Sequence, residues 1–287
     1  MEKYYNSYEI KEMIHIEKMH TMFEMKYDKN YSFPGESHDF WECLYVISGN
    51  VCVSADERVY SLSEGEIIFH KPLEMHKFHI ENEHGAHLFI FSFEMDGILE
   101  ELFRERVFYL SSEQKQTIGS LLKFLRKKTE YYRQSQDFDV PFHEEYLYGF
   151  KMLETYSHIV STYICRLFLS LCDNNGIEQT SESPDALIFK NAINIMNANL
   201  HTWISVETLA RECHISQSGL KRIFRKYSGF PVHKYFLKLK TNLAAQHLAV
   251  GVSVTEIAKL LGFSSQGYFS SVFKRETGFT PYEYKNR

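Results

Sequence analysis

The chain has 287 residues, which is enough for two domains of ordinary size. Hydrophobic residues make up 44%, charged residues 24%, and Gly and Pro only 14 and 6 positions, which excludes a disordered or collagen-like chain. The net charge of −5 hides an asymmetry. Residues 186–287 hold 14 Lys/Arg and 5 Asp/Glu, a net of +9, whereas residues 1–185 hold 18 and 32, a net of −14. We therefore expect two domains with different partners, the basic one suited to a polyanion.

Membrane insertion and export are not expected. The longest apolar stretches, such as Leu88–Phe91, fall far short of the roughly 20 residues that a spanning helix needs. The N-terminus has no basic region followed by an apolar stretch, so we expect a cytoplasmic protein without a membrane partner. Neither a disulfide framework nor a zinc knuckle is indicated by the five scattered cysteines, which are Cys43, Cys52, Cys165, Cys172 and Cys213.

The first part of the chain has the pattern of an all-β domain. Runs rich in β-branched and aromatic residues predict strands at 40–47, 51–53, 66–69 and 87–93. Ser48, Gly49 and Asn50 between two of these runs predict a hairpin turn, because Gly and Asn tolerate positive φ. We assign residues 1–110 to this domain.

Residues 111–172 have helical periodicity. Ser111 followed by Gln114 predicts a capped helix start. A second helix, at about 143–172, carries an apolar stripe of Leu153, Tyr156, Val160, Tyr163 and Leu167. This segment is our expected dimerisation region, although the stripe is equally consistent with a helix that covers its own β-domain.

Residues 173–185 are polar, with a Gly and a Pro, and predict a linker. Beyond it, residues 209–235 and 257–284 form an internal repeat about 48 residues apart. Each unit has the pattern of two short helices joined by a tight turn, with Ala210 or Ala258 at the helix crossing and Gly262 in the second turn. Ser216 and Ser264 are the expected N-caps of the second helices.

The second helix of each unit presents a polar outer face. Leu220, Ile223 and Phe224 point inward in the first unit, and Phe269, Val272 and Phe273 do so in the second. Residues 232–248, without Gly or Pro, predict one long helix of about 25 Å between the units. The outward side chains can donate to base edges and phosphates, and the predicted DNA-binding residues are Gln217, Ser218, Lys221, Arg222, Arg225, Ser265, Gln266, Gly267, Ser270, Ser271 and Lys274.

Residues 262–285, GFSSQGYFSSVFKRETGFTPYEYK, resemble the signature of the AraC/XylS-type DNA-binding domain. The resemblance implies that residues 186–287 hold two helix-turn-helix units and that Ser218, Lys221 and Arg222 approach bases. In the second unit the corresponding positions are Gln266, Gly267 and Ser271. Because Gly267 has no side chain and some members carry Arg where Ser271 stands, we expect the first unit to discriminate bases more strongly. Lys240 stands where the linking helix usually has Arg.

The β-domain resembles the cupin barrels that precede this DNA-binding domain in many AraC-type regulators. Glu36-x-His38-x3-Glu42-x6-Gly49 and Gly65-x5-Lys71 with His76 follow the two cupin motifs in part, with Glu36 in place of a His. Alternation places the candidate side chains on inward strand faces. The resemblance implies an effector pocket, for which the candidate residues are His38, Glu42, His76 and Phe78. The alternatives are polar residues bonded within the barrel, or a metal held by Glu36, His38, Glu42 and His76.

We therefore expect an α+β protein of two domains: a cupin-like jelly-roll barrel with following helices, and an all-α domain with two helix-turn-helix units on a long helix. The expected function is that of a bacterial transcriptional regulator, not an enzyme, without a cofactor or resident metal. Expected partners are promoter DNA, a small-molecule effector such as a sugar, a second copy of the chain, and RNA polymerase. Effector binding is expected to act through helices at 112–172 or through residues 1–20. The alternative is a metal-dependent cupin enzyme or metal sensor fused to a DNA-binding domain.

Overall fold

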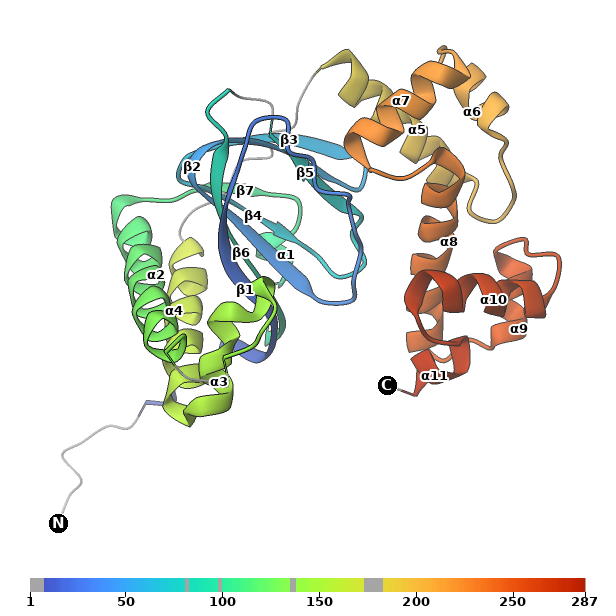
Figure 1. Cartoon of the computed structure of the whole chain (residues 1–287). Helices are drawn as coiled ribbons and strands as arrows, with labels where there is room; N and C mark the ends of the chain where they lie inside the picture. The colour runs from blue at the N-terminus through green and yellow to red at the C-terminus, as the bar shows by residue number, and fades with distance from the viewer. Residues whose placement is uncertain (1–7, 81–82, 98–99, 135–137, 173–182, 287) are drawn as a thin grey trace.

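The computed structural model describes residues 8–80, 83–97, 100–134, 138–172 and 183–286. An N-terminal β-domain, covered on one side by helices, is followed by a C-terminal helical domain on its other side (Figure 1). The α+β organisation with a cupin-like sheet is confirmed. Among the described helices, none is both long and apolar enough to cross a bilayer.

The strands of the β-domain belong to one curved antiparallel sheet with the order β1-β6-β2-β4-β7, to which β3 and β5 add through β2. Aromatic side chains of alternate positions on β6, Phe89, Phe91 and Phe93, are buried on one face. The strands are β1 (Ile14–Tyr27), β2 (Trp41–Ala55), β3 (Arg58–Ser63), β4 (Glu66–His70), β5 (His76–His79), β6 (Ala86–Gly97) and β7 (Val107–Tyr109).

Strand β2 is continuous, so the predicted hairpin turn at Ser48, Gly49 and Asn50 is wrong. The chain instead passes through a register shift between Val46 and Ser48, and the nearby Gly49, which pairs with Ala86, adopts φ +84°. A Cβ on Gly49 would lie 2.4 Å from the carbonyl oxygen of Gly85. The strand therefore bends at a bulge between Val46 and Ser48, with Gly49 beside it, and β2 pairs with β4 and β6 before the bend and with β3 and β5 after it.

Helices α2 (Ser112–Tyr132), α3 (Tyr148–Met152) and α4 (Glu154–Leu171) cover the β-domain on the side away from the C-terminal domain (Figure 1). A short helix α1 (Glu100–Phe103) precedes β7, and a 3-10 turn η1 (Phe142–Leu147) precedes α3. The predicted cap of α2 is confirmed, since Ser111 and Gln114 form a reciprocal capping box.

The helix predicted over 143–172 is broken. Leu153 has an extended backbone between α3 and α4 and is exposed, so it does not belong to the stripe. Tyr156, Val160 and Leu167 are buried against the β-domain of the same chain. The stripe therefore stabilises its own domain, and these buried positions are not available to a partner.

The C-terminal domain contains α5 (Pro184–Ala198), α6 (Val206–Glu212), α7 (Gln217–Tyr227), α8 (Val232–Ala249), α9 (Val254–Leu260), α10 (Gln266–Thr277) and α11 (Pro281–Lys285). Of the predicted linker, residues 173–182 lie outside the described residues. Pro184 and Asp185 already belong to α5, which Ser183 caps. The long helix between the repeat units is confirmed as α8, and the predicted inward residues of α7 and α10 are fully buried.

Of the two N-caps predicted for α7 and α10, one is confirmed and the other is wrong. Ser216 caps α7 as predicted, by accepting a hydrogen bond from the Gly219 amide. The cap of α10 is Ser265, which accepts from the Tyr268 amide, so the prediction of Ser264 is wrong by one position. Ser265 occupies the extended backbone region that an N-cap needs.

Candidate nucleic-acid interface and sensor pocket

Helix α7 separates an apolar face from a basic one. Leu220, Ile223 and Phe224 are buried in the core of the C-terminal domain. The predicted DNA-facing residues Gln217, Ser218, Lys221, Arg222 and Arg225 are all exposed. Lys221, Arg222 and Arg225 are spaced so that they follow one side of the helix, which is the arrangement that contacts to phosphates and base edges require.

Arg222 has an internal partner. Its Nη1 and Nη2 donate to the two carboxylate oxygens of Asp185, at the start of α5, over 2.8 and 3.0 Å. The Arg222 hydrogen bonds hold the pKa of Asp185 below its usual value. The Arg222 side chain is nevertheless 61% exposed, so it lies at the surface although Nη1 and Nη2 each donate one hydrogen bond to Asp185.

The predicted residues of α10 are also at the surface, but several are held by local hydrogen bonds. Ser271 donates to the carbonyl of Gly267 over 3.0 Å, and the Gln266 side chain accepts from the Thr255 hydroxyl over 2.8 Å. Ser265 serves as the cap, Lys274 is exposed and Ser270 is half-buried.

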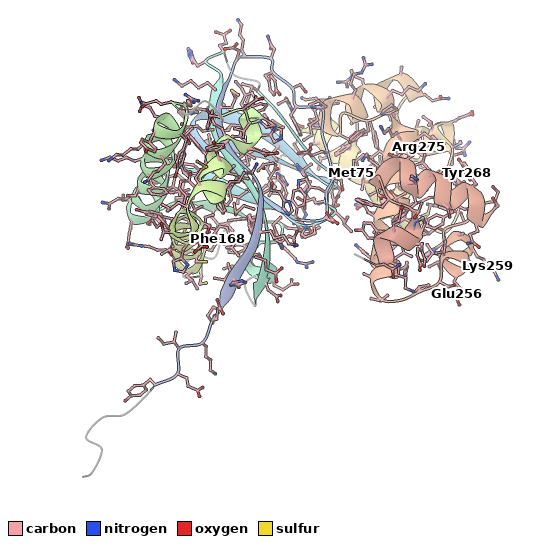
Figure 2. The ribbon with its side chains drawn as sticks, turned by 60° about the horizontal axis from the view of Figure 1, so that its bottom comes forward. Met75, Phe168, Glu256, Lys259, Tyr268 and Arg275 are labelled. Carbon is pink, nitrogen blue, oxygen red and sulfur yellow. The ribbon has the colours of Figure 1, made fainter. Side chains whose placement is uncertain are left out.

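Sequence reasoning missed Tyr268 and Arg275, which are exposed on α10 (Figure 2). Tyr268 is part of the signature at residues 262–285, and Arg275 belongs to the Phe-basic-basic pattern that the two repeat units share, Phe224-Arg225-Lys226 and Phe273-Lys274-Arg275. That shared pattern was the signal that would have identified Arg275 as a surface cation of α10.

Lys240 of α8 joins the two repeat units. It has no exposed surface, and its ammonium donates to the carbonyls of Leu200, Thr202 and Leu261 over 2.6 to 2.7 Å. The ammonium also lies 4.7 Å from the ring centroid of Trp203. Burial lowers the pKa of Lys240 to about 8. The loop between α5 and α6 is thereby tied to the end of α9, which sets the position of one unit relative to the other.

The β-domain has a cavity of about 300 Å³ with aromatic walls. Phe78, a predicted effector residue, stacks on Phe33 with ring centroids 5.2 Å apart and meets Tyr27 edge-on at 5.1 Å. Two carboxylates, those of Glu36 and Glu42, also line the cavity. The combination of flat apolar walls and a few polar groups is typical of a small-molecule site.

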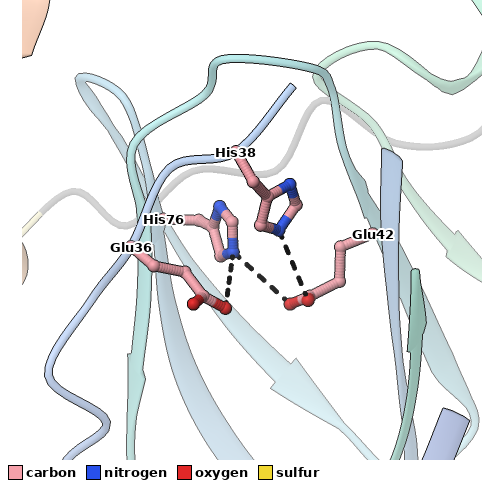
Figure 3. Close-up of side chains that lie close together, drawn as sticks. All are labelled: Glu36, His38, Glu42 and His76. Carbon is pink, nitrogen blue, oxygen red and sulfur yellow. Dashed lines mark ion pairs between the residues drawn. The ribbon is translucent and has the colours of Figure 1, made fainter. Parts of the chain in front are cut away.

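Glu36, His38, Glu42 and His76 converge into what we call the His–Glu cluster (Figure 3). Nε2 of His76 lies 3.7 Å from a Glu36 oxygen and 3.5 Å from a Glu42 oxygen, and Nε2 of His38 lies 3.7 Å from Glu42. Three predicted effector residues therefore lie together, while Phe78 lines the aromatic wall of the cavity.

The backbone places these side chains. Glu36 and His76 form an antiparallel bridge, in which each amide donates to the other residue's carbonyl over 2.9 and 3.0 Å. Glu42 lies at the start of β2. Burial alone would raise the pKa of Glu42, but the neighbouring His76 and His38 outweigh it and hold that pKa well below its usual range. Conversely, Glu42 and Glu36 raise the pKa of His76 against the effect of burial.

The β-domain contacts the C-terminal end of α7 directly. The Lys77 ammonium donates to the carbonyl of Arg225 over 2.7 Å, and the Ser54 hydroxyl donates to the carbonyl of Tyr227. Both carbonyls lie at the negative end of the helix dipole, where a cation is favourable. Cys52, Val59 and Met75 add apolar contacts to the same core, and Figure 2 shows Met75 on the side of the β-domain that faces the helices.

Comparisons with known proteins agree with this arrangement. A family model for an AraC-like ligand binding domain matches residues 24–150, and one for a helix-turn-helix domain matches residues 209–287. The chain is 26% identical over 254 residues to the uncharacterised HTH-type transcriptional regulator YfiF of Bacillus subtilis, which covers 85% of this chain and 76% of that protein. It is 23% identical over 266 residues to the HTH-type transcriptional activator RhaR of Mannheimia succiniciproducens, with 89% and 88% covered.

Among solved structures, ToxT from Vibrio cholerae O395 aligns over 96% of this chain and 98% of that one, with 12% identity and a TM-score of 0.38. This likeness is too weak to bear on the site. The two family models match in the same order as the two domains described above, and each of the two relatives aligns over most of this chain. The chain therefore belongs to the AraC/XylS family of transcriptional regulators and is not an enzyme.

Proposed function

We propose that this protein is an effector-responsive regulator that reads promoter DNA mainly through α7, with α10 in a supporting role. The observation that carries the proposal is the exposed basic face of α7, whose C-terminal end is held by Lys77 and Ser54 of the β-domain. A conformational change in the β-domain would therefore act on α7 through these direct contacts. This route differs from the expected one through residues 112–172, since α2 and α4 lie on the far side of the sheet (Figure 1).

The proposed DNA contacts are the exposed side chains of α7 and α10. On α7 these are Gln217, Ser218, Lys221, Arg222 and Arg225, and on α10 they are Ser265, Gln266, Gly267, Ser270, Ser271 and Lys274, to which we add Tyr268 and Arg275. Support for a stronger first unit comes from the local bonds of Ser271 and Gln266, since a side chain that already has a partner must give it up to reach a base.

The test is selection of duplexes from a random library by the full-length protein. We expect one enriched motif. The affinity of the protein for it should fall steeply between about 50 and 200 mM salt, because salt cations compete with Lys and Arg side chains for the DNA phosphates. Paired half-sites in that motif would support the expectation that the chain binds DNA together with a second copy of itself. Failure to enrich any motif, or an affinity that does not depend on salt, would contradict the proposed function.

We further propose that the aromatic cavity binds the effector, a small molecule with one flat apolar face and several hydroxyl or ammonium donors, a sugar or related metabolite among them. Phe33 and Phe78 provide stacking surface, and Glu36 and Glu42 accept hydrogen bonds. A thermal-shift screen of the full chain against metabolites identifies the ligand, because binding to the folded state raises its melting temperature.

The matched variants for this screen are Phe33→Ala and Tyr109→Ala. Phe33 is a half-buried wall residue of the cavity, whereas Tyr109 is an exposed aromatic residue of β7 outside it. We expect Phe33→Ala to remove most of the ligand-induced shift and Tyr109→Ala to preserve it. An unchanged shift in Phe33→Ala would place the effector elsewhere.

A further inference from the structure

The His–Glu cluster contains buried nitrogen atoms that have no hydrogen-bond partner. Nε2 of both His38 and His76 is unpartnered, and the His76 side chain is only 3% exposed. The other ring nitrogen of each is engaged: Nδ1 of His38 lies 3.0 Å from the carbonyl of Phe40, and Nδ1 of His76 lies 3.1 Å from that of Glu74. A carbonyl only accepts, so each Nδ1 carries a hydrogen and each ring directs its Nε2 into the cluster, where a deprotonated Nε2 is a metal ligand.

With both Nε2 atoms deprotonated, four acceptors face one another. The two carboxylates also offer only lone pairs when ionised, and a group of buried acceptors is unfavourable unless a cation lies between them. The Nε2-to-oxygen separations of 3.5 to 3.7 Å are too long for good hydrogen bonds. They are close to the separation of about 3.3–3.4 Å between two ligand atoms that lie about 2.0–2.1 Å from one tetrahedral metal ion.

We propose that Glu36, His38, Glu42 and His76 bind a divalent first-row transition metal ion, of which Zn²⁺ and Co²⁺ are the best-suited examples. Two imidazoles favour such an ion over Mg²⁺ or Ca²⁺, which prefer oxygen ligands alone. Two carboxylates balance its charge. The hydrogen bonds from Nδ1 to the carbonyls of Phe40 and Glu74 fix the orientation of the two rings, as such bonds do in metal-binding histidines. The Glu36 side chain is 45% exposed and is free to adjust toward the ion.

The position of the cluster links it to the C-terminal domain. Residues 34–38 connect the cluster to the C-terminal domain. Glu36 and His38 enter the cluster, whereas the Ser37 hydroxyl accepts from the Asn242 amide of α8 over 3.4 Å. Asn242 also donates to the carbonyl of Leu73 over 2.5 Å, and the Leu73 amide donates to the carbonyl of His38 over 2.6 Å.

A metal ion on Glu36 and His38 would hold this segment in place, and with it the contacts to α8. The metal would thus stabilise the docked arrangement of the two domains. This coupling rests on the proposed regulatory function, whereas metal binding itself does not.

The test uses the full chain and Co²⁺, whose visible absorption reports its coordination. We expect one Co²⁺ per chain with an intense tetrahedral band, displaced by one equivalent of Zn²⁺. His76→Ala should weaken Co²⁺ binding at least about 100-fold. The milder Glu36→Gln, at a half-exposed position that folding tolerates, should weaken binding about 10-fold. His15→Ala, at an exposed histidine outside the cluster, should bind as the unaltered protein does.

The metal site would be overturned if the unaltered protein did not bind stoichiometric Co²⁺. It would also be overturned if His76→Ala and Glu36→Gln bound Co²⁺ as tightly as the unaltered protein does. For the coupling, hydrogen exchange of Val232–Ala249 should slow on Co²⁺ addition, and Asn242→Ala should remove this effect while Co²⁺ affinity stays the same. If the hydrogen-exchange rates of Val232–Ala249 do not change on Co²⁺ addition, the proposed coupling is wrong. Neither measurement requires DNA, so loss of DNA selection contradicts the proposed function without touching the metal site.

Discussion

Gly35 of the β-domain and Ser228 of the C-terminal domain approach so closely that a Cβ on Gly35 would lie 2.5 Å from the Ser228 carbonyl oxygen. Gly35 also has φ +88°, a conformation that side chains disfavour. The turn between α7 and α8 is therefore packed against the backbone of residues 34–38. Because α7 ends at Tyr227, this contact lies directly beside the helix that we propose reads DNA.

The Gly35→Ala variant should separate the two domains, because both the backbone strain and the contact with Ser228 oppose the added methyl group. We expect calorimetry to show two unfolding transitions in place of one coupled transition. Gly119→Ala, in α2 where nothing lies within 4 Å of an added Cβ, is the control and should be neutral or slightly stabilising. A single unchanged transition in Gly35→Ala would refute the role of this contact.

Arg222→Ala should weaken binding to the selected DNA motif by about 1–3 kcal/mol and binding to random duplex much less, since a base contact carries sequence information. Fluorescence anisotropy with both duplexes measures the two losses. The control is Arg166→Ala, an equally exposed arginine on α4. Equal losses on both duplexes would identify Arg222 as a phosphate contact instead.

Asp185→Asn tests the ion pair from the other side. The carboxylate accepts both Arg222 donors and adds negative charge near the reading helix. Its removal should strengthen DNA binding several-fold at low salt, with a smaller gain at high salt. A weaker affinity would show that Asp185 holds Arg222 in the orientation that reads DNA.

Lys240→Met should destabilise the C-terminal domain by about 3 kcal/mol or more, because three buried carbonyls would lose their donor. Urea denaturation followed by fluorescence of Trp203, which the ammonium contacts, reports this loss. Lys259→Met, at an exposed position of α9, should change the free energy of unfolding by no more than about 0.5 kcal/mol. If the two variants changed the free energy of unfolding by similar amounts, Lys240 would not be what holds the two repeat units together.

Asp56 makes the stability of the β-domain depend on pH. Burial, with Glu74 and Glu57 nearby, raises its pKa to about 7, against the opposing effect of Lys71 and the Met75 amide. In the unfolded chain the pKa is about 3.9, so the folded state binds the proton more tightly between these values. The free energy of unfolding should therefore fall as pH rises from about 4 to about 7.

Urea denaturation across this pH range measures the slope. Asp56→Asn should reduce the slope without abolishing it, because burial also raises the pKa of Glu74 to about 7. Asp28→Asn, at an exposed aspartate, should leave the slope unchanged. An Asp56→Asn protein with the slope of the unaltered chain would assign the dependence to another group.

The sequence by itself determined the features that depend on neighbouring residues. The capping box of Ser111 and Gln114, the buried faces of α7 and α10 and the long helix α8 follow from spacings of three and four residues, which local backbone geometry makes visible. The charge division between the domains is likewise a property of the sequence.

Only the tertiary structure decided the features that join distant segments. Gly49 lies within a continuous strand and not in a turn because it pairs with Ala86 of β6, and the α4 residues of the stripe are buried because they pack against the β-domain. The convergence of Glu36 with His76 depends on a backbone bridge between residues 40 positions apart, and the contact of Lys77 with Arg225 depends on how two domains dock. Such contacts form between surfaces that have no fixed spacing in the sequence, so periodicity alone does not identify them.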